Sequence, residues 1–277
     1  NYNDRIATQY KKYRPDGIVV YGGVNVPEEE KVGIEYAKER PYVDIFFAGP
    51  GEHNFTNFLI NYPNQGIEGH HGSFTHKSYQ AIVNRNEYKK IDIPFPYLEG
   101  IFDNIIKKSK GELSALFETN RGCPYNCAFC DWGGMTRSKL NRANVDKVKD
   151  TISFIMSHPK INKIEIADAN FGIVPTDVEY MQHMIDENAK RDENIYLTMG
   201  GFAKNGSPYT EKIMRMMYST FDAYHGRKYI KLSFQSHDPE VLKAVNRGNL
   251  DNEKLVPMMK RFQAEGVEVD AEIIIGM

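Results

Sequence analysis

Short apolar runs alternate with helical patterns along the second half of the chain. Runs rich in β-branched residues predict strands at 113–119, 163–169, 195–201, 229–236 and 267–276. Apolar positions with helical spacing predict helices at 143–157, 176–190, 208–224, 238–247 and 251–265. Thr176 and Asp238 are expected to cap two of these helices, and Pro239 suits a first helical position. Such successive strand–helix units predict a parallel barrel or an open doubly wound sheet, with the chemistry at the carboxyl ends of the strands.

The first half of the chain has a shorter stretch of the same kind. The runs GIVVYG (17–22) and YVDIFFA (42–48) predict strands, with a helical pattern at 27–39 between them. A strand–helix–strand unit forms a parallel sheet, and ligands bind beyond the carboxyl ends of its strands. Glycine at such an end lets the backbone approach a large ligand closely, although composition alone favours ordinary turn chemistry. The residues at these two ends are Gly22, Gly23, Gly49, Gly51 and Glu52.

The segment from 61 to 110 has less regular patterning and predicts a linker. Its NYPNQGIEGHHGS stretch is typical of a loop, and the prolines of IDIPFPYLEG interrupt any regular element. His70, His71 and His76 have neither a helical spacing nor an acid or thiol beside them. We therefore expect three exposed loop histidines rather than a metal site.

Length and charge restrict the class of protein. The chain has 277 residues and a formal net charge of −2, enough for one large or two small domains and unlike a protein that coats nucleic acid. It contains no apolar run near the roughly 20 residues that a bilayer span requires. The first residue is not Met, and EIIIGM ends the sequence within what reads as a buried strand, which suggests a fragment cut at both ends.

All three cysteines lie in one short loop, RGCPYNCAFC, as Cys123, Cys127 and Cys130. Such a cluster is not a disulfide framework, so a cytoplasmic location is expected. Thiolates suit zinc and iron–sulfur clusters, but structural zinc needs four ligands and no histidine stands nearby. A 4Fe–4S cubane has four iron corners, so three cysteines leave one corner open for a small molecule. The loop therefore predicts a catalytic cluster.

The Cys-x3-Cys-x2-Cys spacing resembles the signature of the radical SAM superfamily. Phe129 stands where that family usually has an aromatic residue. The resemblance implies that ADANFG binds the amino group of S-adenosylmethionine (SAM), with Asp168, Ala169 and Asn170 as the candidate residues. Tyr125 and Trp132 flank the loop and are expected to cover the cluster rather than to contact a substrate.

The later strands resemble the superfamily as well. The resemblance implies that Gln235 and Ser236 contact the ribose or methionine part of SAM, and that Gly276 belongs to a motif beside adenine. Arg247 resembles an arginine that pairs with the SAM carboxylate, and a charge at a helix carboxyl end is an equally common role for it. Lys204 faces either the site or solvent.

Residues 16–54 resemble the last two strands of a cobalamin-binding domain, and PFPYLEGIFDN resembles the connector of the cobalamin-dependent branch. The implied fold is α/β, with a partial (β/α) radical SAM barrel preceded by the C-terminal part of a Rossmann-like cobalamin-binding domain. The expected boundaries are 1–62 for the cobalamin part, 63–110 for a linker and 111–277 for the partial barrel.

The resemblance implies an enzyme that reductively cleaves SAM at a 4Fe–4S cluster to a 5′-deoxyadenosyl radical. Cobalamin would then carry a methyl group to an unactivated carbon of a natural product, peptide or lipid, and a flavodoxin- or ferredoxin-type protein would donate electrons. Two alternatives stay open. One is a cobalamin-independent cyclase or epimerase with a vestigial cobalamin domain, and the other is a non-catalytic cobalamin or Fe–S binding module.

Overall fold

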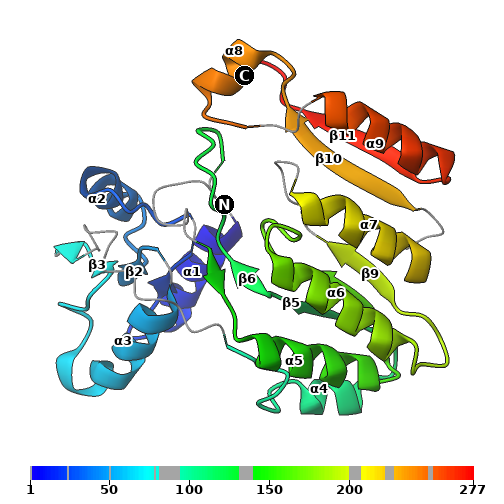
Figure 1. Ribbon diagram of the computed structural model, residues 1–277. Coiled ribbons are helices and arrows are strands. Elements are labelled where there is room, and N and C mark those ends of the chain that lie inside the picture. The colour runs from blue at the N-terminus through cyan, green and yellow to red at the C-terminus, as the bar shows by residue number, and fades with distance from the viewer. Residues whose placement is uncertain are drawn as a thin grey trace. The chain divides into compact units, whose positions relative to one another are not determined.

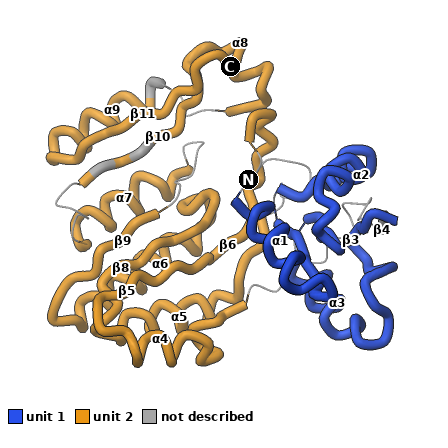
Figure 2. Tube along the Cα trace, turned by 180° about the vertical axis from the view of Figure 1, so that it is seen from behind, with its two compact units in different colours: residues 1–91 blue, residues 92–277 orange. Residues whose placement is uncertain are grey.

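The chain folds into two compact units, residues 1–91 and 92–277 (Figure 2). The computed structural model describes residues 2–23, 25–49, 51–77, 79–80, 94–130, 140–199, 207–221, 228–248 and 252–277. The expected linker, 63–110, is divided between the units, since the boundary lies between residues 91 and 92.

Parallel strands and covering helices make up the second unit (Figure 1). One sheet has the order β5-β8-β9, and β10 pairs in parallel with β11. The strands are β5 (Leu113–Phe117), β8 (Ile161–Ile166), β9 (Tyr196–Met199), β10 (Tyr229–Gln235) and β11 (Glu268–Ile273). The helices are α4 (Asp103–Lys108), α5 (Val145–Ser157), α6 (Pro175–Asn188), α7 (Pro208–Thr220), α8 (Pro239–Ala244) and α9 (Asn252–Ala264). This alternation confirms the predicted strands and helices, with shifted ends.

Apolar side chains from strands and helices pack into two core clusters in this unit. Ile164 and Ile166 of β8 lie fully buried against α5 and α6, and each contributes roughly 1.5–3 kcal/mol. Helix α7 belongs to both clusters, because Ile213 packs in the first and Met214 in the second. Met214 and Met217 are buried, which confirms that the methionines of α7 fill the core. The α7 helix thus joins the two groups of strands into one partial barrel.

The first unit is built around a small mixed sheet of order β1-β2-β3-β4. Its strands are β1 (Val20–Tyr21), β2 (Ile45–Phe47), β3 (Ser73–Phe74) and β4 (Tyr79–Gln80), and its helices are α1 (Tyr2–Tyr13), α2 (Glu30–Lys38) and α3 (Gly51–Gln65). Strands β1 and β2 are parallel and α2 connects them, as the sequence predicted. Strand β3 runs antiparallel to β2, and Phe74 stacks on Phe46 with ring centroids 4.9 Å apart.

Several local expectations were wrong. Helices α1 and α3 were not predicted. Val174, and not Thr176, occupies the N-cap of α6, whereas Asp238 and Pro239 begin α8 as expected. His70 was expected to be exposed, but it is buried because its ring packs on Phe58, and its Nε2 donates to the carbonyl of Gly66 at 2.7 Å. His71 and His76 are exposed, as expected.

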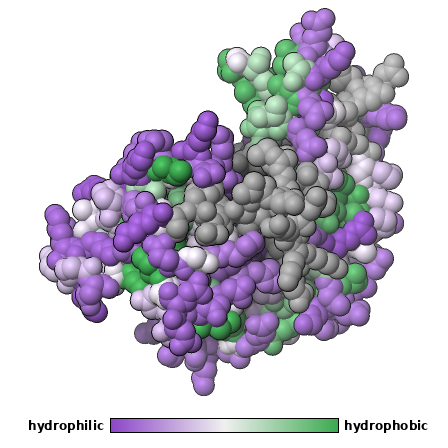
Figure 3. Space-filling model, turned by 90° about the vertical axis from the view of Figure 1, so that its left-hand side faces the viewer, coloured by the Kyte–Doolittle hydropathy of each residue, from purple (hydrophilic) through white to green (hydrophobic). Residues whose placement is uncertain are grey.

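Strand β11 was expected to be buried, yet most of its side chains are exposed. Within the described residues it pairs with β10. In the part of the chain that the structure describes, no helix is both long and apolar enough to span a membrane. Hydrophilic side chains cover much of the face drawn in Figure 3, with hydrophobic ones in small separate areas.

Candidate active site

The cysteine loop begins just beyond the carboxyl end of β5, as the sequence predicted. A two-residue antiparallel ribbon, β6 (Asn120–Arg121) with β7 (Asn141–Arg142), closes its base. The three thiols are free; Cys123 and Cys127 are buried and Cys130 is partly exposed. The loop therefore presents its sulfurs in a protected place and not as a disulfide.

Two side chains from other segments of the second unit donate to cysteine sulfurs. Asn170, which follows β8, donates from Nδ2 to Cys123 Sγ at 3.4 Å. Arg247, which follows α8, donates from Nη1 to Cys127 Sγ at 3.9 Å. The loop backbone is also held at α8, since Ala128 N donates to the carbonyl of Val245 at 2.9 Å. Segments far apart in sequence thus converge on the cysteines.

A buried carboxylate fastens the segment that leads into the loop. Asp168 accepts from Thr119 N at 2.7 Å and from Thr119 Oγ1 at 2.6 Å. Asn120 Nδ2 lies 3.3 Å from the same carboxylate and 3.1 Å from Asp177 Oδ1. Both carboxylates are almost fully buried. Thr119, Asn120 and Asp177 were not among the residues that the sequence singled out.

Asp168 was expected to contact the amino group of SAM. The structure places its carboxylate against Thr119 and Asn120, which occupy both oxygens. Its neighbour Ala169 is partly buried, and Asn170 is buried. Among the residues that the structure describes, Asn170 Oδ1 has no hydrogen-bond partner. That oxygen is therefore a buried side-chain acceptor that could receive a hydrogen bond from a ligand.

Burial raises the pKa of Asp168 to about 6, against hydrogen bonds from Thr119 that lower it. Burial also raises the pKa of Asp177 and raises that of Tyr180 to about 12. Burial removes the water that would stabilise the ionised forms, and the hydrogen-bond donors nearby compensate for this loss only in part.

The pKa of Asp168 predicts how stability depends on pH. Because the folded pKa is raised from 3.8 to about 6, this carboxyl stabilises the fold fully below pH 4 and loses that contribution as pH rises to 6. The loss amounts to roughly 3 kcal/mol. The free energy of unfolding, measured with urea between pH 4 and 7, should fall more steeply with rising pH for the parent protein than for Asp168→Asn. Parallel profiles would contradict the assignment.

The remaining barrel candidates lie at the end of β10 and beyond. Gln235 has a positive φ of 69° at an irregularity in the β10–β11 pairing, and its carbonyl accepts from Ile274 N at 2.8 Å. Ser236 is partly buried, and Gly276 is exposed with a φ of 80°. Arg247 is 6% exposed and lies just beyond the end of α8, where its backbone N–H donates to the carbonyl of Leu242 at 2.9 Å. Its Nη2 donates to the carbonyl of Ser233.

In the cysteine loop, Tyr125 is partly buried, and its pKa is raised chiefly by this burial. The Phe129 ring centroid lies 5.8 Å from the Arg247 guanidinium carbon, and the residue is 37% exposed. Trp132 and Lys204 lie outside the described residues.

The candidates of the first unit follow β1 and β2 as predicted. Gly22 and Gly23 are exposed beyond β1, and Gly49 is buried beyond β2 with a φ of 72°. Gly51 begins α3, and the side chain of Glu52 points outward from its first turn. A Cβ added at Gly23 or Gly51 would meet no atom within 4 Å, so there is open space at this end of the sheet.

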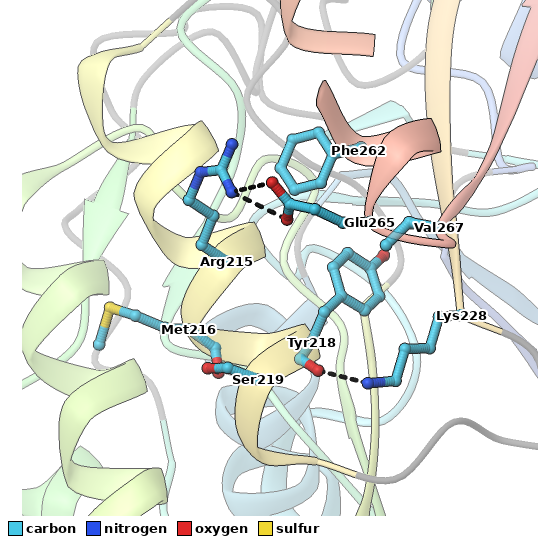
Figure 4. A pocket seen from close by; sticks show the side chains of 8 residues that line it. All are labelled: Arg215, Met216, Tyr218, Ser219, Lys228, Phe262, Glu265 and Val267. Atoms are coloured by element: carbon cyan, nitrogen blue, oxygen red, sulfur yellow. Dashed lines mark hydrogen bonds and ion pairs between the residues drawn. The ribbon is translucent and has the colours of Figure 1, made fainter. Parts of the chain in front are cut away.

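A separate cavity of about 360 Å³ lies between α7 and α9 (Figure 4). Its lining includes Lys228 and Val267, which directly precede β10 and β11, so it is at the opposite ends of these strands from Gln235. Arg215 pairs with Glu265 at 2.6 Å, and Lys228 donates to the carbonyl of Tyr218 at 2.6 Å. Since both cations already have partners, this cavity is not the candidate site.

Two curated relatives match nearly the whole chain. A 2-(S-pantetheinyl)-carbapenam-3-carboxylate methyltransferase of Streptantibioticus cattleyicolor is 31% identical over 99% of this chain and 40% of its own length. The cobalamin-dependent radical SAM methyltransferase TokK of Streptomyces tokunonensis is 30% identical, with the same coverage. Both relatives are thus named as methyltransferases, and one of them as a cobalamin-dependent radical SAM enzyme. The chain spans about 40% of the length of these relatives, and no protein-family model matches it.

Solved structures of cobalamin-dependent radical SAM enzymes share the fold. The enzyme OxsB, with aqua-cobalamin and SAM bound, aligns with a TM-score of 0.60 at 16% identity, over 98% of this chain and 38% of its own. The radical SAM methyltransferase TsrM of Kitasatospora setae aligns with a TM-score of 0.67 at 12% identity, over 99% of this chain and 53% of its own. The α/β fold with a partial radical SAM barrel is thereby confirmed.

The residues of the cysteine loop suit the cluster of this family. Each thiolate of a cubane binds a different iron, so the three free thiols supply ligands for three of its four corners. Side-chain N–H groups donate to two of the sulfurs, and Asn170 Oδ1 is a buried acceptor without a described partner. The site thus offers both donors and an acceptor to a ligand.

Proposed function

We propose that the protein is a cobalamin-dependent radical SAM methyltransferase that acts on an unactivated carbon. The observation that carries the proposal is the convergence of Asn170 and Arg247 on the sulfurs of Cys123 and Cys127 at the carboxyl ends of the barrel strands. That is where the chemistry of such barrels takes place. The names of the homologues supply the reaction class.

Each side chain has a role that its surroundings support. The thiolates of Cys123, Cys127 and Cys130 would hold three iron corners, and the buried positions of the first two limit access of water. Asn170 Oδ1 would accept from the amino group of SAM. Arg247 would donate to the SAM carboxylate, a group whose planar shape its guanidinium matches, and Gln235, Ser236 and Gly276 lie at the adjoining strand ends.

The first unit would hold cobalamin at the carboxyl ends of β1 and β2. Gly22, Gly23, Gly49, Gly51 and Glu52 lie there, and the open space beside Gly23 and Gly51 supports this placement. When bound, the cluster and SAM supply a radical initiator and cobalamin supplies the methyl group. The protein's part is to orient these groups and to exclude water and oxygen.

The substrate we propose is a small natural product. One homologue is named for a carbapenam carboxylate, which makes small-molecule natural products the first class to test ahead of peptides and lipids. A flavodoxin- or ferredoxin-type protein is the proposed electron donor.

Electron paramagnetic resonance tests the proposal on the full-length protein, reconstituted without oxygen and reduced with dithionite. We expect a reduced-cluster signal that changes when SAM is added, and retention of cobalamin through gel filtration. A signal indifferent to SAM would favour a non-catalytic module. A SAM-responsive cluster without retained cobalamin would favour a cobalamin-independent cyclase or epimerase, and zinc in place of iron would overturn the proposal.

A further inference from the structure

We propose that Asn170 and Arg247 tune the reduction potential of the cluster through hydrogen bonds to the thiolates of Cys123 and Cys127. Both would be positioning and tuning residues in addition to any contact with SAM. The inference rests on the proposed function, because it requires a cluster on the three cysteines.

The Asn170 amide has a defined orientation for this role. Its Nδ2 lies 3.4 Å from Cys123 Sγ, and both residues are 2% exposed. A thiolate bound to iron can accept a hydrogen bond but has no proton to donate, so the NH2 group and not the carbonyl must face it. The carbonyl oxygen then points away from the sulfur and stays available.

Arg247 is held in place by a second contact of its guanidinium. Nη2 donates to the carbonyl of Ser233 in β10, while Nη1 lies 3.9 Å from Cys127 Sγ. The guanidinium also lies near the ring of Phe129, 5.8 Å from its centroid. With the residue 6% exposed, its positive charge is poorly screened by water.

Reduction adds one negative charge to the cluster, and the reduced form gains most from nearby donors and cations. Hydrogen bonds to cluster sulfurs and the local charge are recognised determinants of Fe–S potentials. A low local dielectric strengthens both effects. Asn170 and Arg247 should therefore raise the potential, which makes the one-electron reduction by an external donor easier.

The test is a redox titration of the reconstituted full-length protein with dithionite, followed by the cluster's electron paramagnetic resonance signal. Iron and sulfide content are measured in every sample. We expect lower potentials for Asn170→Leu and Arg247→Met, and a lower one still for the double variant. Arg247→Lys keeps the charge but loses the planar fork, so its potential should fall between Arg247→Met and the parent. Arg261→Met, which removes an arginine on the exposed face of α9, is the matched control and should leave the potential unchanged.

Equal potentials in all these proteins, with full cluster content, would overturn the inference while leaving the proposed function intact. If Asn170→Leu takes up no cluster, the Arg247 variants decide the matter. Loss of cluster from both Arg247 variants would also overturn it, because assembly rather than tuning would then depend on this residue. A parent protein that binds no cluster would instead overturn the proposed function.

Discussion

Replacement of Cys127 by alanine is expected to abolish cluster assembly and the reductive cleavage of SAM. The loop supplies three thiolates, and alanine at this position leaves one iron corner without its ligand. Cys127 is also the cysteine that receives the Arg247 guanidinium, so the substitution leaves a buried cation without its sulfur partner. Activity should fall below detection, because the chemistry depends on the cofactor.

Iron and sulfide analysis, the resonance spectrum and 5′-deoxyadenosine formation measure the outcome. Ala128→Ser is the matched control, since it changes the adjacent, exposed side chain and keeps all three thiols. Far-ultraviolet circular dichroism of both variants checks that the barrel is folded. A Cys127→Ala protein that still forms 5′-deoxyadenosine would contradict the cluster assignment.

The sequence predicted the barrel elements well because their signal is local. Each apolar stripe of α5 or α6 recurs every three to four residues, and each strand is a short β-branched run. Helix α3 was missed because it begins at Gly51, inside a Gly-Pro-Gly turn signal, and contains Pro63. Its formation depends on packing of Phe58 against Phe47, a contact that no local pattern reveals.

The local part of the site was predictable from the sequence, and the part that depends on strand pairing was not. The cysteine spacing is a local signature, and it led directly to the loop. The partners of Asp168 lie 48 and 49 residues earlier, at Asn120 and Thr119, so only the paired strands β5 and β8 bring them together. A polar Thr-Asn pair just before the cysteines was the available signal, and it is too common in turns to single out. The cofactor roles of the individual residues stay predictions.

Asp177→Ala is expected to destabilise the protein by about 3–5 kcal/mol, the largest stability effect we expect from a single polar residue. Asp177 Oδ2 accepts from the backbone N–H groups of Gly172, Ile173 and Val174 at 2.8, 2.9 and 3.1 Å, and Oδ1 accepts from Asn120 Nδ2 at 3.1 Å. The side chain is fully buried, so water cannot replace these bonds in the variant.

Asp186→Ala provides the control on the same helix, because Asp186 is exposed and accepts only a surface hydrogen bond from Gln182 among the contacts described. Asp186→Ala should change the free energy of unfolding by no more than about 0.5 kcal/mol. Asp177→Asn should lie between the two, since one oxygen remains for the backbone donors while its NH2 group faces the amide of Asn120. Urea unfolding of the three variants measures these differences.

Because Asn120 links Asp177 to Asp168 and so to the start of the cysteine loop, Asp177→Ala should also lower cluster content where Asp186→Ala does not. Equal stabilities of Asp177→Ala and Asp186→Ala would show that this buried network does not support the loop.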